Sequence, residues 1–219
     1  MKSLEFYEQH REEYMKIEQR LDKLNEKFLA ASQQKQRRLL LDSYIFAVIS
    51  VQTPVETHEN AFKQIKQGEE YEDALSSVNY WKNKVNYIRK TEVKFETIDH
   101  VITQLEKGNT DAAHRMIADN FKGVATVKAA FTLAMLGFKT KACVDTNVLT
   151  ALDIDRDEMY DGVVIKKYNE FVDESFKKIS PDLLQQTGNK FMTQWVIFDS
   201  VRGELTTHDA FFNNLGVEI

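Results

Sequence analysis

The stretch that decides the fold runs over residues 119–152 and reads DNFKGVATVKAAFTLAMLGFKTKACVDTNVLTAL. Its first part predicts the end of a helix, a tight turn over residues 121–125 and a new helix over about 126–136. Its second part places Asp145 directly before another helical run, residues 146–152. A glycine-containing turn between two helices leaves backbone N–H groups without partners, which suits a phosphate oxygen. Since the Asp145 carboxylate is expected to point to nearly the same place, this stretch predicts a functional site.

The same stretch resembles the helix-hairpin-helix superfamily of DNA glycosylases (HhH-GPD, endonuclease III-like). The hairpin of that superfamily usually reads L-P-G-V-G-x-K-x-A and is followed by V-D-x-H/N-V. Here residues 121–129 read F-K-G-V-A-T-V-K-A, and residues 144–148 read V-D-T-N-V.

Three positions of the hairpin differ from the superfamily pattern. Lys122 replaces the proline, Ala125 replaces the second glycine, and Val127 stands where bifunctional members carry their Schiff-base lysine. Lys128 comes one residue later, and since a helix turns about 100° per residue, we expect its side chain to face elsewhere. Ala125 would distort the hairpin if its position required a positive φ.

A second short motif, residues 49–53 (I-S-V-Q-T), resembles the superfamily's L-S-x-Q-T segment. The resemblance implies that Gln52 enters the space left by an extruded base. An amide suits this role because it can both donate to and accept from the orphaned partner base. A polar residue at a helix end without further role is the alternative.

A third motif, Tyr80-Trp81-Lys82-Asn83-Lys84-Val85 followed by Ile88, resembles the superfamily's Y-x-x-K-A-x-x-I helix. Tyr80 and Trp81 are therefore candidates for a base pocket. Aromatic side chains also serve as core anchors, which is the alternative for both residues.

Almost every segment has a helical pattern and none shows convincing strand alternation, so we predict an all-α, two-lobed fold of the glycosylase type. Residues 1–38 are expected to add a long amphipathic helix that packs on the core, with a coiled-coil arm as the alternative. Residues 39–219 are expected to form the glycosylase-like domain, with the hairpin at about 111–136 and the catalytic aspartate loop at 143–147. Residues 39–51 are apolar almost all round and predict a buried central helix. A further helix is expected after a charged loop, ending near residue 178.

The composition is that of an ordinary globular protein, with 219 residues, 42% hydrophobic and 29% charged. No apolar run is long enough for a membrane span and no secretory signal is evident, so we expect a cytoplasmic protein acting at the nucleoid. The sequence does not define the oligomeric state, and a monomer is the expectation. The formal net charge of −5 argues mildly against bulk nucleic-acid binding, although one face can still be basic.

Neither a metal site nor a cofactor is expected. Iron–sulfur members of the superfamily carry four cysteines after the last helix, whereas residues 202–219 contain none, so no cluster can form there. The five histidines, at positions 10, 58, 100, 114 and 208, show no metal-ligand spacing. The resemblance does allow a monovalent cation at the hairpin.

Asp145 is the expected catalytic carboxylate. Cleavage of a nucleotide's N-glycosyl bond passes through an oxocarbenium-like sugar, which a carboxylate stabilises while it deprotonates an attacking water. The alternative for Asp145 is an ordinary helix N-cap, and the two roles are compatible. Lys128 is a candidate nucleophile only if the hairpin register shifts by one residue; otherwise it contacts a phosphate. The expected DNA contacts are Gln52, Thr53, Lys122, Gly123, Val124, Ala125, Thr126 and Asn147.

Together these features predict a base-excision N-glycosylase, a hydrolase that flips a damaged or modified base out of double-stranded DNA and removes it. Because Val127 replaces the nucleophilic lysine, a monofunctional enzyme is preferred over a lyase. Two alternatives remain: a base-modifying transferase on the same scaffold, of the kind implicated in phage thymine hypermodification, and a non-catalytic DNA-binding module.

Overall fold

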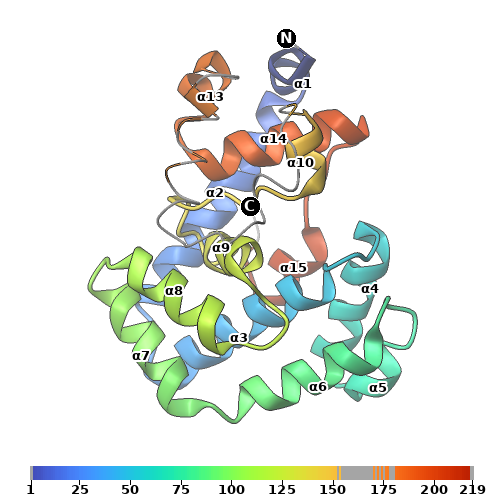
Figure 1. The fold of residues 1–219 in the computed structure, drawn as a ribbon, viewed down its shortest axis with the longest axis vertical. Coiled ribbons are helices and arrows are strands. Elements are labelled where there is room, and N and C mark those ends of the chain that lie inside the picture. Colours follow the sequence, from blue (N-terminus) through green and yellow to red (C-terminus); the bar gives the residue numbers. More distant parts are fainter. Residues whose placement is uncertain are drawn as a thin grey trace.

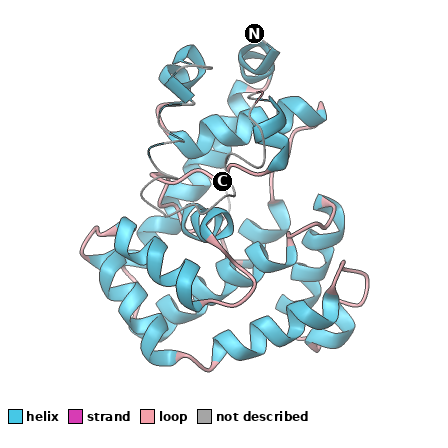
Figure 2. Ribbon diagram, viewed as in Figure 1, coloured by secondary structure: helices cyan, strands magenta, loops and turns pink. Residues whose placement is uncertain are grey.

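The computed structural model describes residues 2–151 and 181–217, together with positions 153, 170, 172, 174, 176 and 177. All regular elements within these residues are helices, as Figures 1 and 2 show, and the all-α prediction is confirmed. They are α1 (Lys2–Gln9), α2 (Arg11–Leu29), α3 (Gln33–Ile49), α4 (Val55–Lys66), α5 (Tyr71–Ala74), α6 (Trp81–Glu92), α7 (Phe95–Glu106), α8 (Thr110–Asn120), α9 (Thr126–Ala134), α10 (Thr146–Ala151), α13 (Pro181–Thr187), α14 (Lys190–Arg202) and α15 (Asp209–Asn214). The helix expected to end near residue 178 falls mostly outside the described residues.

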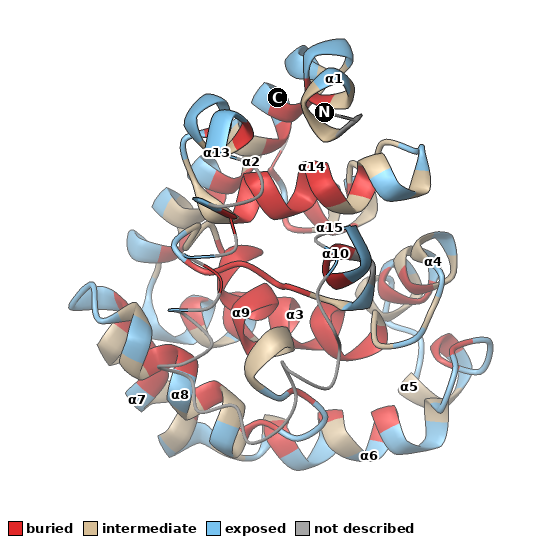
Figure 3. Cartoon of the chain, turned by 45° about the horizontal axis from the view of Figure 1, so that its top comes forward, coloured by how far each residue is buried: buried red, intermediate tan, exposed pale blue. Residues whose placement is uncertain are grey.

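Helix α3 lies at the centre of the helices from α4 to α9. Its side chains from Leu39 to Ile49 are buried almost without interruption, as expected for a helix that is apolar all round. It packs against α4, α6, α7 and α9. Figure 3 shows α3, α9 and α14 as the most deeply buried helices.

The helices fall into two groups, visible in Figure 1 as the lower and upper parts of the molecule. Helices α3 to α9 form the lower group, and α15 packs against α4. Helices α1, α10 and α13 surround α14 in the upper group. No described helix has both the length and the apolar character needed to cross a membrane.

The N-terminal region differs from the single helix expected. A turn at His10 separates α1 from α2, and residues 33–38 form the beginning of α3, so position 38 lies inside a helix rather than between elements. The apolar face of α2 is buried against the rest of its own chain. The Tyr14 hydroxyl donates to Asp199 Oδ2 of α14 at 2.9 Å, and the Phe28 and Phe138 rings meet edge to face with centroids 5.8 Å apart. These contacts give α2 a place in the core rather than in a free coiled-coil arm.

Candidate DNA-binding and catalytic site

Helices α8 and α9 are joined by the predicted hairpin, residues 121–125. The turn requires glycine at one position, because Gly123 has φ +78° and a Cβ there would lie 2.4 Å from Tyr87 Cδ2. The Lys122 carbonyl accepts a hydrogen bond from the Tyr44 hydroxyl at 2.7 Å, and the Lys122 N–H donates to Thr91 Oγ1 at 3.2 Å. These bonds fix the hairpin to α3 and α6.

The amides at the tip of the hairpin remain available for a ligand. Within the described chain, the backbone N–H groups of Gly123, Val124 and Ala125 make no hydrogen bond. Ala125 has φ −103°, an extended conformation that any residue adopts, so alanine does not distort the hairpin here. The hairpin therefore keeps its shape despite losing the second glycine of the superfamily pattern.

Substituting Gly123 by alanine is expected to lower the affinity for DNA. The loss should exceed the one caused by the unfavourable left-handed backbone conformation alone, because the added Cβ would also clash with Tyr87. The control is Gly108→Ala, which has a similar φ of +72° but no atom within 4 Å of the added Cβ. Both variants carry the left-handed backbone cost of about 1–2 kcal/mol, and only Gly123→Ala also displaces Tyr87. Fluorescence anisotropy with duplex DNA should show weaker binding for Gly123→Ala alone. Equal affinities in the two variants would contradict a role for the hairpin in DNA binding.

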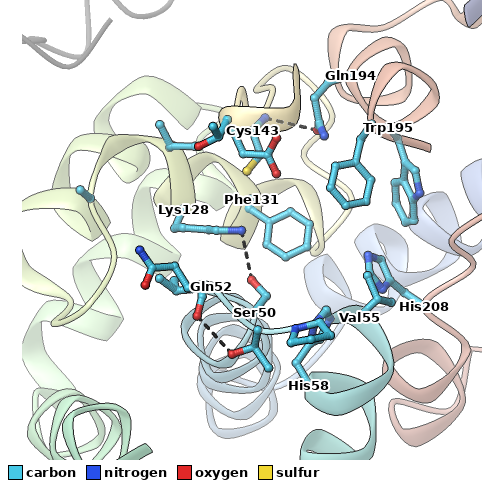
Figure 4. Close-up of a pocket in the computed structure, with 18 of the residues that line it drawn as sticks. Ser50, Gln52, Val55, His58, Lys128, Phe131, Cys143, Gln194, Trp195 and His208 are labelled. Carbon is cyan, nitrogen blue, oxygen red and sulfur yellow. Dashed lines mark hydrogen bonds between the residues drawn. The ribbon is translucent and has the colours of Figure 1, made fainter. Parts of the chain in front are cut away.

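A cavity of about 960 Å³ opens beside the hairpin. Its walls come from the segment between α3 and α4, from the start of α9, from the segment before α10, and from α14 (Figure 4). The lining residues are Ser50, Val51, Gln52, Thr53, Pro54, Val55, His58, Asn79, Gly123, Ala125, Thr126, Val127, Lys128, Phe131, Cys143, Asp145, Thr146, Phe191, Gln194, Trp195, Phe198, Arg202 and His208. The cavity thus brings together three segments that the sequence had marked separately.

Lys128 reaches into this cavity, contrary to the expectation that it would face elsewhere. Its Nζ donates to Ser50 Oγ at 3.1 Å and lies 4.9 Å from the centroid of the Phe131 ring (Figure 4). The expectation was wrong because it considered only the rotation of about 100° per residue, whereas Lys128 lies in the first turn of α9 and its side chain is long enough to reach the cavity. Val127 lines the same cavity, so both neighbouring positions reach it.

Asp145 also lines the cavity and caps α10, since its Oδ1 accepts from the Val148 N–H at 3.1 Å. Burial raises the pKa of the Cys143 thiol to about 12, and the charges of Lys128 and Asp145 act on the same thiol in opposite directions. Both charged groups therefore lie near Cys143. Asn147 is a residue of α10, and its side chain is outside the described part of the structure.

Gln52 sits at the cavity with an exposed side chain and a left-handed backbone, φ +51°. Its carbonyl accepts from Asn79 Nδ2 at 2.5 Å. A non-glycine residue in this conformation persists only where its surroundings hold it, a situation common at functional sites. The surrounding loop therefore holds the Gln52 backbone in a fixed conformation, which limits the directions that its side chain can take.

The buried side chain of Lys84 binds the loop that carries Gln52. The sequence did not predict this role. Its ammonium donates to the carbonyls of Ile49 and Val51, at 3.1 and 2.6 Å, and to Thr53 Oγ1 at 2.9 Å. Burial, with a smaller contribution from the Lys128 charge, lowers the pKa of Lys84 to about 8. The sequence signal that could have indicated this role is the position of Lys84 on the same helical face as the buried residues Ile88 and Thr91.

Neither Tyr80 nor Trp81 lines this cavity, so their predicted contact with a base stays a prediction. The Tyr80 side chain is 66% exposed, and Trp81 packs at the edge of the core. The aromatic lining comes instead from α9 and α14, as Phe131, Phe191, Trp195 and Phe198. The apolar pattern of residues 191–201 alone does not distinguish a core helix from a pocket wall.

The described residues that could hold a metal ion are His58, Glu59 and His208, whose ligand atoms all lie within 4.8 Å of one another. His208 has φ +50°, and its Nδ1 lies 2.8 Å from Glu59 Oε1. Burial and, to a smaller extent, the neighbouring His208 lower the pKa of His58 to about 2. Both histidines line the cavity.

No protein-family model matches the sequence, and no curated protein sequence matches it either. Among solved structures, the chain is similar to the 8-oxoguanine DNA glycosylase of Thermotoga maritima, with a TM-score of 0.69 and 18% sequence identity. The match covers 93% of this chain and 97% of that one. The resemblance found in the sequence is thus confirmed for the fold, and the chain has the fold of a DNA glycosylase.

Proposed function

We propose that this protein binds double-stranded DNA and hydrolyses the N-glycosyl bond of a damaged or modified base turned into the cavity. The observation that carries the proposal is the position of Asp145, which lines the same cavity as Gln52 and the glycine hairpin. Its carboxylate is the group that the chemistry needs, at a place that an extruded nucleotide would reach.

Asp145 would act on the sugar rather than on the base. Its Oδ1 is oriented by the Val148 N–H, so the carboxylate is held in place before a substrate arrives. As the N-glycosyl bond breaks, positive charge develops on the sugar, and the carboxylate stabilises it and accepts a proton from the attacking water. The base leaves with the bonding electrons.

The remaining contacts divide between the base and the backbone. The aromatic side chains of α9 and α14 offer faces on which an extruded base can stack. Gln52 would fill the space left in the duplex. The hairpin amides, together with Lys122 and Thr126, would bind one backbone phosphate, and the monovalent cation expected there stays a prediction. Thr53 accepts from Lys84 and would act by holding the loop.

Mass spectrometry of duplex oligonucleotides with a panel of damaged and modified bases, 8-oxoguanine included, tests the proposal directly. We expect base loss from at least one substrate. A gain of mass on the base would instead identify a transferase, and binding without any change across the panel would identify a DNA-binding module.

Lyase activity is a second candidate function, because the Lys128 ammonium lies in the cavity near Ser50 and Phe131. After losing its proton, the amine would attack the sugar C1′ and expel the base with the bonding electrons. Transfer of a proton from the nitrogen to O4′ and cleavage of the C1′–O4′ bond would then give an iminium, which would allow loss of a C2′ proton and elimination of the 3′ phosphate.

Borohydride reduction of that iminium should link wild-type protein covalently to DNA, and Lys128→Met should abolish the link. Lys107→Met is the control, since Lys107 is an exposed lysine at the end of α7 that neither lines the cavity nor belongs to the proposed DNA contacts. Base release without strand cleavage or covalent trapping would assign the protein to the monofunctional class.

A further inference from the structure

A cluster of three possible metal ligands lies at the base of the cavity. His58 and Glu59 are neighbours near the start of α4, and His208 directly precedes α15, which packs against α4. The possible ligand atoms of His58, Glu59 and His208 all lie within 4.8 Å of one another. Figure 4 shows His58 and His208 close together, at the opposite end of the cavity from Cys143.

His58 is buried without a hydrogen-bond partner. Its exposed fraction is 3%, and neither Nδ1 nor Nε2 makes a hydrogen bond with the described residues. The carbonyls of Thr53 and Pro54 are near the ring but do not reach hydrogen-bond geometry. A buried polar group without a partner is costly and uncommon in native proteins, so this imidazole requires an explanation.

We propose that His58, Glu59 and His208 form a binding site for a divalent transition-metal ion of the zinc class. Two imidazoles and one carboxylate form an established ligand set for zinc with an open fourth position. The ion would accept the lone pair of the orphaned His58 nitrogen. It would also replace the contact between His208 and Glu59 by two metal–ligand bonds.

The ring positions are close to those that a shared ion requires. With metal–nitrogen distances of about 2.0–2.1 Å and tetrahedral angles, two bound imidazoles have ring centres about 5 Å apart. The His58 and His208 ring centroids are 5.7 Å apart. Closing this difference takes a small tilt of the rings. The Glu59 side chain, 20% exposed, has room to rotate toward the ion.

The open position of the site would face the cavity. Both histidines line it, whereas Phe46 packs edge to face on His58 and on His208, with centroids 4.9 and 5.1 Å away. Ligands therefore approach the ion from the cavity side. A bound water or an oxygen or nitrogen atom of a base would occupy the fourth position.

Sequence spacing could not reveal this site. His58 and His208 lie in distant parts of the chain, and only the packing of α15 on α4 brings them together. The sequence-based expectation of no metal site rested on local spacing alone.

Metal binding by untagged full-length protein tests the proposal without DNA. Isothermal titration with Zn²⁺ should give one site per chain, and titration with Co²⁺ should give the visible absorption of a four-coordinate ion. The variants are His58→Leu, which fits a buried site, Glu59→Gln, and His208→Asn, chosen because asparagine tolerates a left-handed backbone. His100→Gln is the control, since it removes an exposed histidine elsewhere.

Each ligand variant should weaken Zn²⁺ binding by at least about tenfold, while His100→Gln should match wild type. Thermal unfolding by circular dichroism shows which variants remain folded, and zinc should raise the unfolding temperature of wild type but not of a folded ligand variant. Absence of zinc binding by wild type, or unchanged binding in Glu59→Gln and His58→Leu, would overturn the proposal. Because no DNA is involved, either result is independent of glycosylase activity.

Discussion

Replacing Asp145 by asparagine is expected to slow base release by about 10²–10³-fold or more, because the developing charge on the sugar loses its stabilising carboxylate. Asparagine is as good a helix N-cap as aspartate, so the cap on the Val148 N–H survives the exchange. The free energy of unfolding should therefore change by less than about 0.5 kcal/mol. Single-turnover rates of base release, measured on a substrate identified in the oligonucleotide panel, give the effect.

Asp145→Ala is the matched comparison, since it removes both the charge and the cap. It should lose the same activity and an additional ~1 kcal/mol of stability. DNA affinity should remain similar in both variants. If Asp145→Asn released base at the wild-type rate, Asp145 would be only a cap, and catalysis would require another group.

Among the glycines that the structure describes, Gly137 is the one whose substitution by alanine is expected to reduce stability most. Gly137 has φ +83°, and an added Cβ would lie 2.2 Å from the Leu21 carbonyl oxygen and 2.7 Å from Asn25 Cβ. Both atoms belong to α2, and a backbone carbonyl within a helix cannot move aside cheaply. We expect a loss of more than about 3 kcal/mol, or failure to fold.

Gly108→Ala again isolates the backbone cost, because its positive φ is similar and its surroundings are open. It should lose only about 1–2 kcal/mol in urea denaturation. Similar losses in the two variants would show that α2 does not pack closely on the end of α9. A much larger loss at Gly137 would show that the N-terminal helices are part of the core.

The parts of the fold that the sequence predicted are those encoded locally. The continuous apolar run of α3, the glycine at position 123 and the aspartate before α10 each determine their own segment, so their positions could be predicted. The break at His10 was not predicted, because large apolar residues recur every seven positions on both sides of it, at Tyr7, Tyr14, Leu21 and Phe28. The sequence of α1 and α2 alone does not show whether the helices on which they pack require a straight helix or a turn at His10.

The site was predicted only in part, for a related reason. Gln52, Gly123 and Asp145 belong to short motifs, and the structure brings all three to one cavity. The direction of Lys128 depended on the position of the cavity relative to the first turn of α9, and the aromatic wall depended on how α14 packs across the cavity. Tyr80 and Trp81 belonged to an equally plausible motif but do not line the cavity.

Helix α3 connects the parts of the proposed DNA-binding site. The Tyr44 hydroxyl donates a hydrogen bond to the Lys122 carbonyl of the hairpin. At the end of the helix, Ser50 Oγ accepts a hydrogen bond from the Lys128 ammonium, and the loop with Gln52 follows directly. At about 1.5 Å per residue, Tyr44 and Ser50 are separated by about 9 Å along a stiff, buried rod. In the proposed complex, α3 would therefore set a constant distance between the bound phosphate and the vacated base position. Because a buried helix does not stretch, the distortion needed to make both contacts would fall on the DNA, and we expect base steps that kink easily to be bound best.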